Sequence, residues 1–276
     1  MRISANRKHG MNSFDYTGKT ALITGASSGI GWVFAQQLAA RGAALILTAR
    51  SELKLQVLAA ELQRNHGVSI TIIVQDLMAS DAITNIAARL DALRLYPDII
   101  VNNAGFATYG PFDTLSLERQ REEIKVNCLA PVELTYAMLP KMLLSGSGVI
   151  INVASTAAMQ PDPYMAVYGA TKSFLLSFSN ALWAEYRSRG IRVLALCPGA
   201  TDTAFFDVVN AEEASVGKRM SAESVVKQAL GAVDTNRNYL ITGCKNWLLG
   251  QLQRFVTRQR LLLIAEKVLR PKQVRD

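Results

Sequence analysis

The chain has 276 residues, of which 50% are hydrophobic, and a formal net charge of +8. This length and apolar content allow one large α/β domain with an extensive core, and they exclude disorder of the whole chain. No segment approaches the roughly 20 consecutive apolar residues that a membrane-spanning helix requires, so the sequence predicts a protein that does not span a bilayer.

The excess of positive charge lies mainly at the C-terminal end. Residues 245–276 contain eight Lys or Arg and two Asp or Glu, which gives this segment a net charge of +6. Nucleic-acid binding is disfavoured as a function, because these cations are confined to an apolar-rich tail without a recognised nucleic-acid-binding motif.

The cysteines and the N-terminus bear on the cellular compartment. Cys128, Cys197 and Cys244 have no pairing or metal-ligand spacing and lie within or beside apolar runs. This pattern predicts buried, reduced thiols and no metal site. Residues 1–16 contain no apolar run long enough for a secretory signal, so we expect a non-secreted, cytoplasmic protein.

Short β-rich runs alternate with longer helical runs along most of the chain. The predicted strands are residues 20–24, 44–48, 69–74, 99–102, 149–154, 192–196 and 239–241. Predicted helices between them include residues 31–41, 53–64, 117–144 and 168–189. Strands that alternate with helices form a parallel sheet, and such strands are continuously apolar when both faces are buried, as residues 149–154 largely are.

These elements predict an α/β fold with a doubly wound, seven-stranded parallel sheet of Rossmann type in a single domain. We expect this domain over residues 17–243, with an N-terminal extension at residues 1–16 and a basic, amphipathic helical extension at residues 244–276. Ligands of such sheets bind beyond the carboxyl ends of the strands, where the candidate site residues below are expected.

The first predicted strand leads directly into the loop Thr24-Gly-Ala-Ser-Ser-Gly-Ile-Gly31 and then into a helix. In this context glycines let the backbone approach a pyrophosphate at the helix N-terminus. The spacing of Gly25, Gly29 and Gly31 is G-x-x-x-G-x-G. A tight connection without a ligand is the alternative for the loop taken alone.

Tyr168, Lys172 and Ser155 form the candidate chemical centre. Positions i and i+4 share one helix face, so the Lys172 ammonium can favour ionisation of the Tyr168 phenol. Lowering the pKa of a phenol from about 10 to about 7 requires roughly 4 kcal/mol. One cation at about 5 Å supplies roughly 3 kcal/mol at an effective dielectric constant near 20, and the positive charge of an oxidised nicotinamide ring close to the same oxygen would supply most of the remainder. Histidine is not needed; His9 lies in the N-terminal extension and His66 in a polar connection before a strand, both expected at the surface.

Five ordered motifs resemble those of the short-chain dehydrogenase/reductase family, and the resemblance covers about residues 17–243. They are Thr24-Gly-Ala-Ser-Ser-Gly-Ile-Gly31, Asn102-Asn-Ala-Gly105, Ser155, Tyr168-Gly-Ala-Thr-Lys172 and Pro198-Gly199. A Tyr-x-x-x-Lys spacing alone has little diagnostic value, whereas the five motifs in this order are specific.

The resemblance implies four catalytic residues. Tyr168 would donate a proton to the substrate carbonyl during reduction, and Ser155 would hold the same oxygen by a hydrogen bond. Lys172 would lower the pKa of the phenol and bind the nicotinamide ribose. Asn127 would order, through its backbone, a water that links the lysine to solvent; an ordinary polar residue in a helix is the alternative for Asn127.

The resemblance also implies a set of cofactor contacts. Asp76 and Leu77 fit the position that contacts adenine, although an aspartate that starts a helix is also a common N-cap. The segment at residues 198–203 would hold the nicotinamide carboxamide, with a simple turn as the alternative. The expected contacts are Gly25, Ser27, Ser28, Gly29, Ile30, Gly31, Arg50, Ser51, Asp76, Leu77, Asn103, Ala104, Gly105, Tyr168, Lys172, Pro198, Gly199, Thr201 and Thr203.

The end of the second strand bears on the choice of cofactor. An acidic residue there would bind the ribose 2′-hydroxyl of NAD, whereas a cation favours the 2′-phosphate of NADP. The chain has Arg50 and Ser51 and no carboxylate at this point, and the guanidinium group suits a phosphate. We therefore expect NADP(H) over NAD(H), with a solvated loop arginine as the alternative.

The substrate side is less specific in sequence. Phe205, Phe206, Val208 and Val209, together with Ala157, Met159, Pro161 and Tyr164, are expected to form an apolar wall. Such a wall predicts a lipophilic ketone or aldehyde, although ordinary packing is the alternative. The tail beyond Gly243 is predicted to form one or two helices that pack on the domain, on a partner subunit or on a membrane surface.

The sequence thus predicts an NADP-dependent oxidoreductase acting on a lipophilic carbonyl compound or secondary alcohol, such as a 3-ketoacyl thioester, a steroid-like compound or another bulky ketone. A homodimer or higher homo-oligomer is expected through the helices at residues 117–144 and 168–189. A catalytically silent NADP-binding sensor or scaffold is the alternative, but it need not retain Asn127, Ser155, Tyr168 and Lys172 together.

Overall fold

A computed structural model describes residues 13–205, 218–252 and 255–272 of the chain. Its main sheet contains β1 (Thr20–Thr24), β2 (Ala44–Ala49), β3 (Ile70–Val74), β4 (Ile99–Asn102), β5 (Gly148–Val153), β6 (Ile191–Cys197) and β9 (Tyr239–Ile241). All seven strands are parallel, in the order β3-β2-β1-β4-β5-β6-β9. The predicted strands are confirmed, with bounds that differ by at most one residue.

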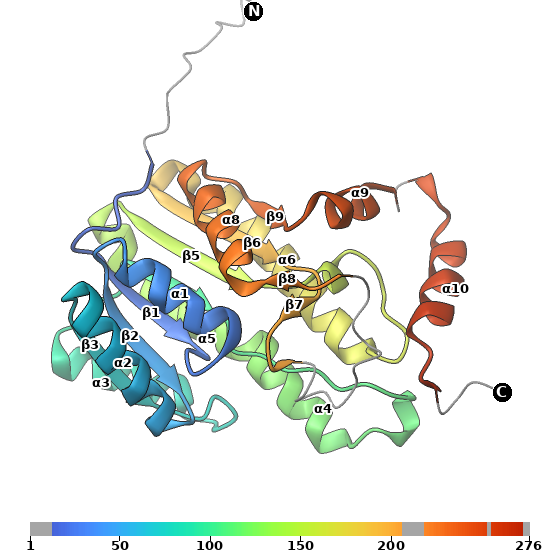
Figure 1. Ribbon diagram of the computed structural model, residues 1–276, viewed down its shortest axis with the longest axis horizontal. Coiled ribbons are helices and arrows are strands. Elements are labelled where there is room, and N and C mark those ends of the chain that lie inside the picture. The colour runs from blue at the N-terminus through green and yellow to red at the C-terminus, as the bar shows by residue number, and fades with distance from the viewer. Residues whose placement is uncertain (1–12, 206–217, 253–254, 273–276) are drawn as a thin grey trace, which may run out of the picture.

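Helices cover both faces of this sheet (Figure 1). They are α1 (Gly29–Ala39), α2 (Glu52–His66), α3 (Ala82–Leu93), α4 (Leu117–Ile124), α5 (Ala130–Ser145), α6 (Ala166–Tyr186) and α8 (Ala222–Asp234). One core packs α1, α2 and α8 against the sheet, and a second packs α3, α5 and α6 against the opposite face. Within β1, Ala21 and Ile23 belong to the first core and Leu22 to the second, which is why the strand is continuously apolar.

The long helix predicted at residues 117–144 is interrupted, so that prediction is wrong in its continuity. A π-helical segment, Lys125–Leu129, lies between α4 and α5. Pro131, the second residue of α5, has no backbone N–H, so it cannot complete the α-helical hydrogen bond to the carbonyl group of Asn127. The other three predicted helices begin and end within three residues of α1, α2 and α6 with its terminal turn.

Two expectations about single residues need correction. His66 is exposed as expected, but it is the last residue of α2 and does not lie in a connection; the helix ends at Gly67, whose φ is +67°. The three cysteines carry free thiols. Cys197 is buried and Cys128 is half-buried, whereas Cys244 is exposed because it begins a helix outside the sheet. His9 lies outside the described residues.

The C-terminal segment forms two helices, α9 (Cys244–Leu252) and α10 (Arg258–Leu269). They lie at the end of the molecule opposite β2 and β3 (Figure 1). Among the residues that the structure describes, no helix has both the length and the apolar character needed to cross a membrane. A short parallel pair that was not predicted, β7 (Thr201–Asp202) with β8 (Met220–Ser221), links the chain after β6 to the start of α8.

Candidate active site

A cavity of about 1380 Å³ lies along the carboxyl ends of the strands. The order of the sheet brings the loops after β1, β2, β4, β5 and β6 to this edge, because parallel strands end on the same side. The cavity is lined by every predicted cofactor contact except Gly31, and by Ser155, Tyr168 and Lys172 among the predicted catalytic residues. Asn127 is fully buried and does not line it.

The glycine loop has the geometry that a phosphate group requires. Gly25 and Gly29 have φ values of +64° and +56°, in the left-handed region that glycine adopts without strain. A Cβ atom at Gly31 would collide with the carbonyl oxygen of Gly25, so Gly31 serves close packing and not the cavity wall. Ser28 precedes α1 without capping it by its side chain, which leaves the first-turn N–H groups to face the cavity.

Hydrogen bonds join this loop to the end of β4. The Thr24 hydroxyl accepts from the backbone N–H groups of Asn103 (2.9 Å) and Ala104 (3.0 Å) and donates to the carbonyl of Val101 (3.3 Å). The Asn103 side-chain amide donates to the carbonyls of Thr24 (2.9 Å) and Gly25 (3.2 Å). These bonds fix the distance between two walls of the cavity.

The loop after β2 supplies positive charge. Arg50 is exposed and lines the cavity with Ser51, which precedes α2. Lys54 lines the same region and was missed in the sequence, although it follows Arg50 by four positions. No carboxylate is found among the described cavity residues of this loop, and the two cations with the α2 N-terminus fit a phosphate ester.

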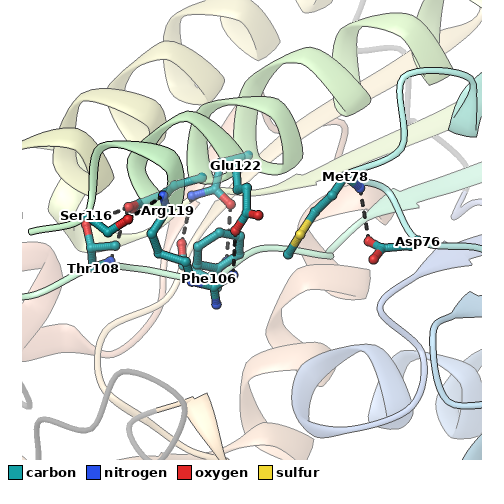
Figure 2. Close-up of polar contacts among 9 residues, drawn as sticks. Asp76, Met78, Phe106, Thr108, Ser116, Arg119 and Glu122 are labelled. Atoms are coloured by element: carbon teal, nitrogen blue, oxygen red, sulfur yellow. Dashed lines mark hydrogen bonds and ion pairs between the residues drawn. The ribbon is translucent and has the colours of Figure 1, made fainter.

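Asp76 and the segment after β4 also line the cavity, and Figure 2 shows polar contacts of both segments. The Asp76 carboxylate accepts from the backbone N–H of Met78 (3.0 Å) in a local turn, and α3 starts only at Ala82, so the N-cap alternative for Asp76 is wrong. The guanidinium of Arg119 lies 3.9 Å from the centre of the Phe106 ring and donates to Glu122 (2.8 Å). These contacts brace the chain that follows Gly105.

Tyr168, Ser155 and Lys172 all line the cavity. The Lys172 Nζ atom lies 5.6 Å from the centre of the Tyr168 ring and donates to the carbonyl of Val153 (2.8 Å). The Ser155 hydroxyl accepts from the backbone N–H of Ala157 (3.1 Å), which orients it at the end of β5. Tyr168 and Lys172 are buried, with 7% and 4% of their surface exposed.

Burial governs the protonation of these two groups. Desolvation raises the pKa of Tyr168 above its usual value; the hydrogen bond with Ser155 opposes this rise, and the charges of Asp162 and Glu123 add to it. Desolvation also lowers the pKa of Lys172 to about 8. The predicted pKa near 7 includes the charge of an oxidised nicotinamide ring as well as that of Lys172; in the protein without that ring, burial has the largest influence and raises the pKa of Tyr168.

Asn127 lies on the π-helical segment, a feature that often occurs at functional sites. Its side-chain amide donates to the carbonyl of Phe106 (2.9 Å) and the hydroxyl of Thr171 (3.1 Å), and its side-chain oxygen accepts from the N–H of Phe106 (3.2 Å). The side chain thus joins the segment after β4 to α6. Its contact on α6 is Thr171, one residue before Lys172.

A family model described as short chain dehydrogenase matches residues 19–214. The chain belongs to this family. Very-long-chain 3-oxoacyl-CoA reductase of Anas platyrhynchos is 37% identical over 186 residues, which are 66% of this chain and 59% of that protein. The chain thus spans less than two thirds of that relative's length. 17-beta-hydroxysteroid dehydrogenase type 3 of Mus musculus is 32% identical over 217 residues, 78% of this chain and 70% of that protein.

Solved structures of short-chain dehydrogenases resemble the whole fold. An enzyme of Sphingobium yanoikuyae in complex with NADPH has a TM-score of 0.77 and 34% identity, covering 86% of this chain and 94% of that one. The bulky-bulky ketone specific alcohol dehydrogenase of Comamonas testosteroni has a TM-score of 0.73 and 30% identity, covering 94% and 96%.

Two buried acids beside the predicted catalytic residues of this short-chain dehydrogenase were missed in the sequence. Glu123 has no exposed surface and accepts from the N–H (3.2 Å) and hydroxyl (2.8 Å) of Thr108; burial raises its pKa to about 7. Asp162 lines the cavity, and burial raises its pKa to about 6. Glu123 precedes Asn127 by four positions, but this spacing alone does not distinguish a buried acid from a surface acid.

A buried polar network that was also missed supports α6. The Asn102 amide donates to the side-chain oxygen of Asn152 (2.7 Å), and the Asn152 amide donates to the hydroxyl of Ser179 (2.8 Å). The network therefore connects β4 and β5 to the helix that carries Tyr168 and Lys172.

The segment after β6 closes over the glycine loop. Pro198, Gly199, Thr201 and Thr203 line the cavity, and a Cβ atom at Gly29 would lie 3.1 Å from the methyl group of Thr203. The turn at the end of β6 thus reaches the place where the first helix begins.

The predicted substrate wall is only partly assembled from the expected residues. Ala157, Met159 and Phe205 line the cavity, whereas Pro161 and Tyr164 do not. Pro161 is exposed, and the Tyr164 hydroxyl donates to Glu266 of α10 instead (2.8 Å). Phe206, Val208 and Val209 lie outside the described residues. Residues of α9 and α10 line the cavity as well, which the sequence did not indicate.

Proposed function

We propose that this short-chain dehydrogenase is an NADP(H)-dependent oxidoreductase that interconverts a lipophilic ketone or aldehyde and its alcohol. The convergence of Ser155, Tyr168 and Lys172 in the cavity that also holds the glycine loop carries this proposal. The names of the relatives, which include a 3-oxoacyl-CoA reductase, a hydroxysteroid dehydrogenase and a bulky-ketone alcohol dehydrogenase, support a lipid-like carbonyl compound.

The bound cofactor would supply a hydride equivalent in reduction. Tyr168, whose raised pKa keeps the phenol protonated at neutral pH, would give its proton to the carbonyl oxygen. Ser155 would hold that oxygen by a hydrogen bond. Lys172, with a pKa of about 8, is mostly an ammonium at neutral pH and would stabilise the phenolate left behind. Asn127 would present its carbonyl, which Pro131 cannot bond in the α-helical manner, to a water next to Lys172.

The remaining contacts would hold the dinucleotide. We propose that the glycine loop binds the pyrophosphate, that Asp76 and Leu77 contact adenine, and that residues 103–105 border the adenosine ribose. Residues 198–203 would hold the carboxamide of nicotinamide. Arg50 and Lys54 favour the 2′-phosphate of NADP over the hydroxyl of NAD, because both cations face the cavity where that phosphate would lie.

We propose one catalytic domain over residues 17–243, flanked by an N-terminal segment at residues 1–16 and a C-terminal segment at residues 244–276. We also propose that the protein is cytoplasmic. Peripheral membrane contact is supported by the exposed Trp247, Leu248 and Phe255 of a basic tail, and co-sedimentation with anionic vesicles tests it.

The proposed activity is tested by following NADPH absorbance with a panel of ketones that ranges from small methyl ketones to aryl ketones and 3-oxoacyl thioesters. We expect oxidation of NADPH with the lipophilic members of the panel. Tight NADPH binding without oxidation by any ketone would instead favour the catalytically silent sensor.

A further inference from the structure

The helix α10 turns an apolar face toward the catalytic cavity. The residues of this helix that line the cavity are Leu261, Ile264, Ala265, Val268 and Leu269. Positions 261, 264, 265 and 268 follow the i, i+3, i+4, i+7 spacing of one helical face. The same cavity contains Tyr168 and Ser155, so a segment about a hundred residues further along the chain borders the proposed reaction centre.

Two tyrosines hold α10 in this place. The Tyr164 hydroxyl donates to Oε1 of Glu266 (2.8 Å), and Nε of Arg270 donates to the same oxygen (2.8 Å). The Tyr109 hydroxyl donates to the backbone carbonyl of Leu269 (2.8 Å). Tyr109 follows the segment after β4 and Tyr164 precedes α6, so both anchors come from chain segments that flank the catalytic residues.

Tyr164 also has an unusual backbone conformation. Its φ is +64°, in the left-handed region that a residue with a large side chain rarely adopts. This turn aims the phenol at α10, away from the cavity that its neighbours line. A strained conformation that secures one contact indicates that the contact has a role.

The inner face of α10 is apolar and only partly covered by protein. Ala265 and Leu269 are buried, whereas Ile264 and Val268 line the cavity and are 56% and 47% exposed. An apolar wall at the side of a carbonyl-binding centre favours an apolar group on the carbonyl carbon, since burying each methylene group contributes to binding. Polar contact from α10 to the carbonyl itself is not required.

We propose that α10 is the specificity wall of the substrate site, where Ile264 and Val268 contact the long or bulky apolar substituent of the carbonyl substrate. Glu266 is a positioning residue that keeps the wall in place through Tyr164. This inference rests on the proposed function and deepens it, since it assigns substrate discrimination to the C-terminal extension. Small ketones bind at Tyr168 and Ser155 without reaching α10.

Adjacent residues of α10 provide a matched test. Ile264 lines the cavity and Leu263 does not, yet the two are exposed to the same extent, 56% and 58%. With 2-decanone we expect Ile264→Ala to raise KM about tenfold, the scale on which apolar pockets discriminate small differences in bulk. With 2-butanone KM should change less than about twofold, and the Kd for NADPH should stay the same. Leu263→Ala should leave all three values unchanged.

Four further variants test the wall. Val268→Phe adds bulk to the cavity and should impair reduction of 2-decanone much more than reduction of 2-butanone. Tyr164→Phe removes the hydrogen bond to Glu266 and should raise KM for 2-decanone while leaving kcat for 2-butanone unchanged. Glu266→Gln, which retains an acceptor for Tyr164, should have a smaller effect than Glu266→Ala.

The outcomes separate this inference from the function on which it rests. Equal effects of Ile264→Ala and Leu263→Ala on KM for 2-decanone, in a protein that reduces both ketones, would refute the role of α10. The proposed function would then still stand. Failure of the parent protein to reduce either ketone would count against the proposed function itself. The proposed role of α10 in substrate discrimination would then be rejected as well.

Discussion

Burial sets the charge of Glu123, a fully buried acid whose charge acts on Tyr168 and Lys172. Its side chain has no exposed surface, Lys172 is among the charges that act on it, and its pKa is raised from 4.5 to about 7. A raised pKa means that the folded state binds the proton more tightly than the unfolded state. The stabilising contribution of protonated Glu123 is therefore fully present below about pH 4.5 and is lost as pH rises through about 7.

We expect Glu123→Gln to remove this part of the pH dependence of stability. Between about pH 4.5 and pH 8 the parent should lose roughly 3 kcal/mol of unfolding free energy that the variant retains. Denaturant unfolding at several pH values measures the difference. Asp162, whose pKa is raised to about 6, gives a smaller loss of the same sign in both proteins. Glu122→Gln is the control, because Glu122 is partly exposed and bound to Arg119; equal profiles for Glu123→Gln and the parent would contradict the account.

Arg50 determines the preference for NADPH in our proposal. A charge-assisted hydrogen bond to phosphate contributes about 1.5 to 3 kcal/mol, so Arg50→Ala should weaken NADPH binding roughly tenfold or more. Binding of NADH should hardly change, since NADH lacks the 2′-phosphate. Fluorescence titration measures both, with Arg64→Ala on the exposed end of α2 as the control. Equal losses for both cofactors would show that Arg50 does not recognise the phosphate.

Sequence reasoning at this scale found residues whose chemistry is tied to a local motif. The glycine loop and the Tyr168–Lys172 spacing are such cases, and the cofactor contacts predicted from them line the cavity, with the exception of Gly31. Lys54, Glu123 and Asp162 were missed because only tertiary burial and proximity to the cavity distinguish them from surface residues. For the same reason the sequence did not indicate that burial raises the pKa of Tyr168.

The break between α4 and α5 is the main feature at the scale of elements. Hydrophobic periodicity continues through residues 117–144, so the sequence pattern predicted one helix. Pro131 alone marked the interruption, and proline is tolerated in the first turn of a helix. The π-helical segment places Asn127 where its side chain joins Phe106 to Thr171, which periodicity cannot foresee.

We expect Pro131→Ala to lower activity while the protein stays folded. Alanine restores the N–H that an uninterrupted α-helix needs and would let the segment Lys125–Leu129 shift, which displaces Asn127. Misplacement by about 1 Å near a reaction centre costs up to about a hundredfold in rate, so we expect a tenfold to hundredfold loss in kcat. Pro140→Ala, in the exposed part of α5, should keep parental activity. Full activity of Pro131→Ala would refute the role of the break.

At the scale of the whole molecule, the alternation of strands and helices sufficed to predict the parallel sheet and its seven strands. The order of the strands, with β1 and β4 adjacent at the centre, follows from packing and not from the pattern of apolar residues. The α9 and α10 helices were expected, but their place at the cavity depends on Tyr109 and Tyr164, which lie far away in sequence.

The quaternary structure is also a matter of the whole molecule. Tyr136 and Leu144 of α5 are 83% and 84% exposed, and an apolar groove of about 310 Å³ lies between α4 and α6. These surfaces support the proposed dimer, so we expect the parent to sediment as a dimer and Tyr136→Asp to weaken it, because a buried unpaired charge is costly. Val57→Asp on the exposed side of α2 is the control. A parent that sediments as a monomer would contradict the dimer.

The central claim is that Tyr168 is the proton donor in a cavity that binds NADPH independently of that proton. The most direct measurement compares Tyr168→Phe with the parent for ketone reduction and for NADPH binding in the same preparation. We predict a loss of about a hundredfold or more in kcat, the usual contribution of a general acid. The Kd for NADPH should remain within about twofold, since only the hydroxyl is removed. Reduction by Tyr168→Phe at the parental rate would contradict the account.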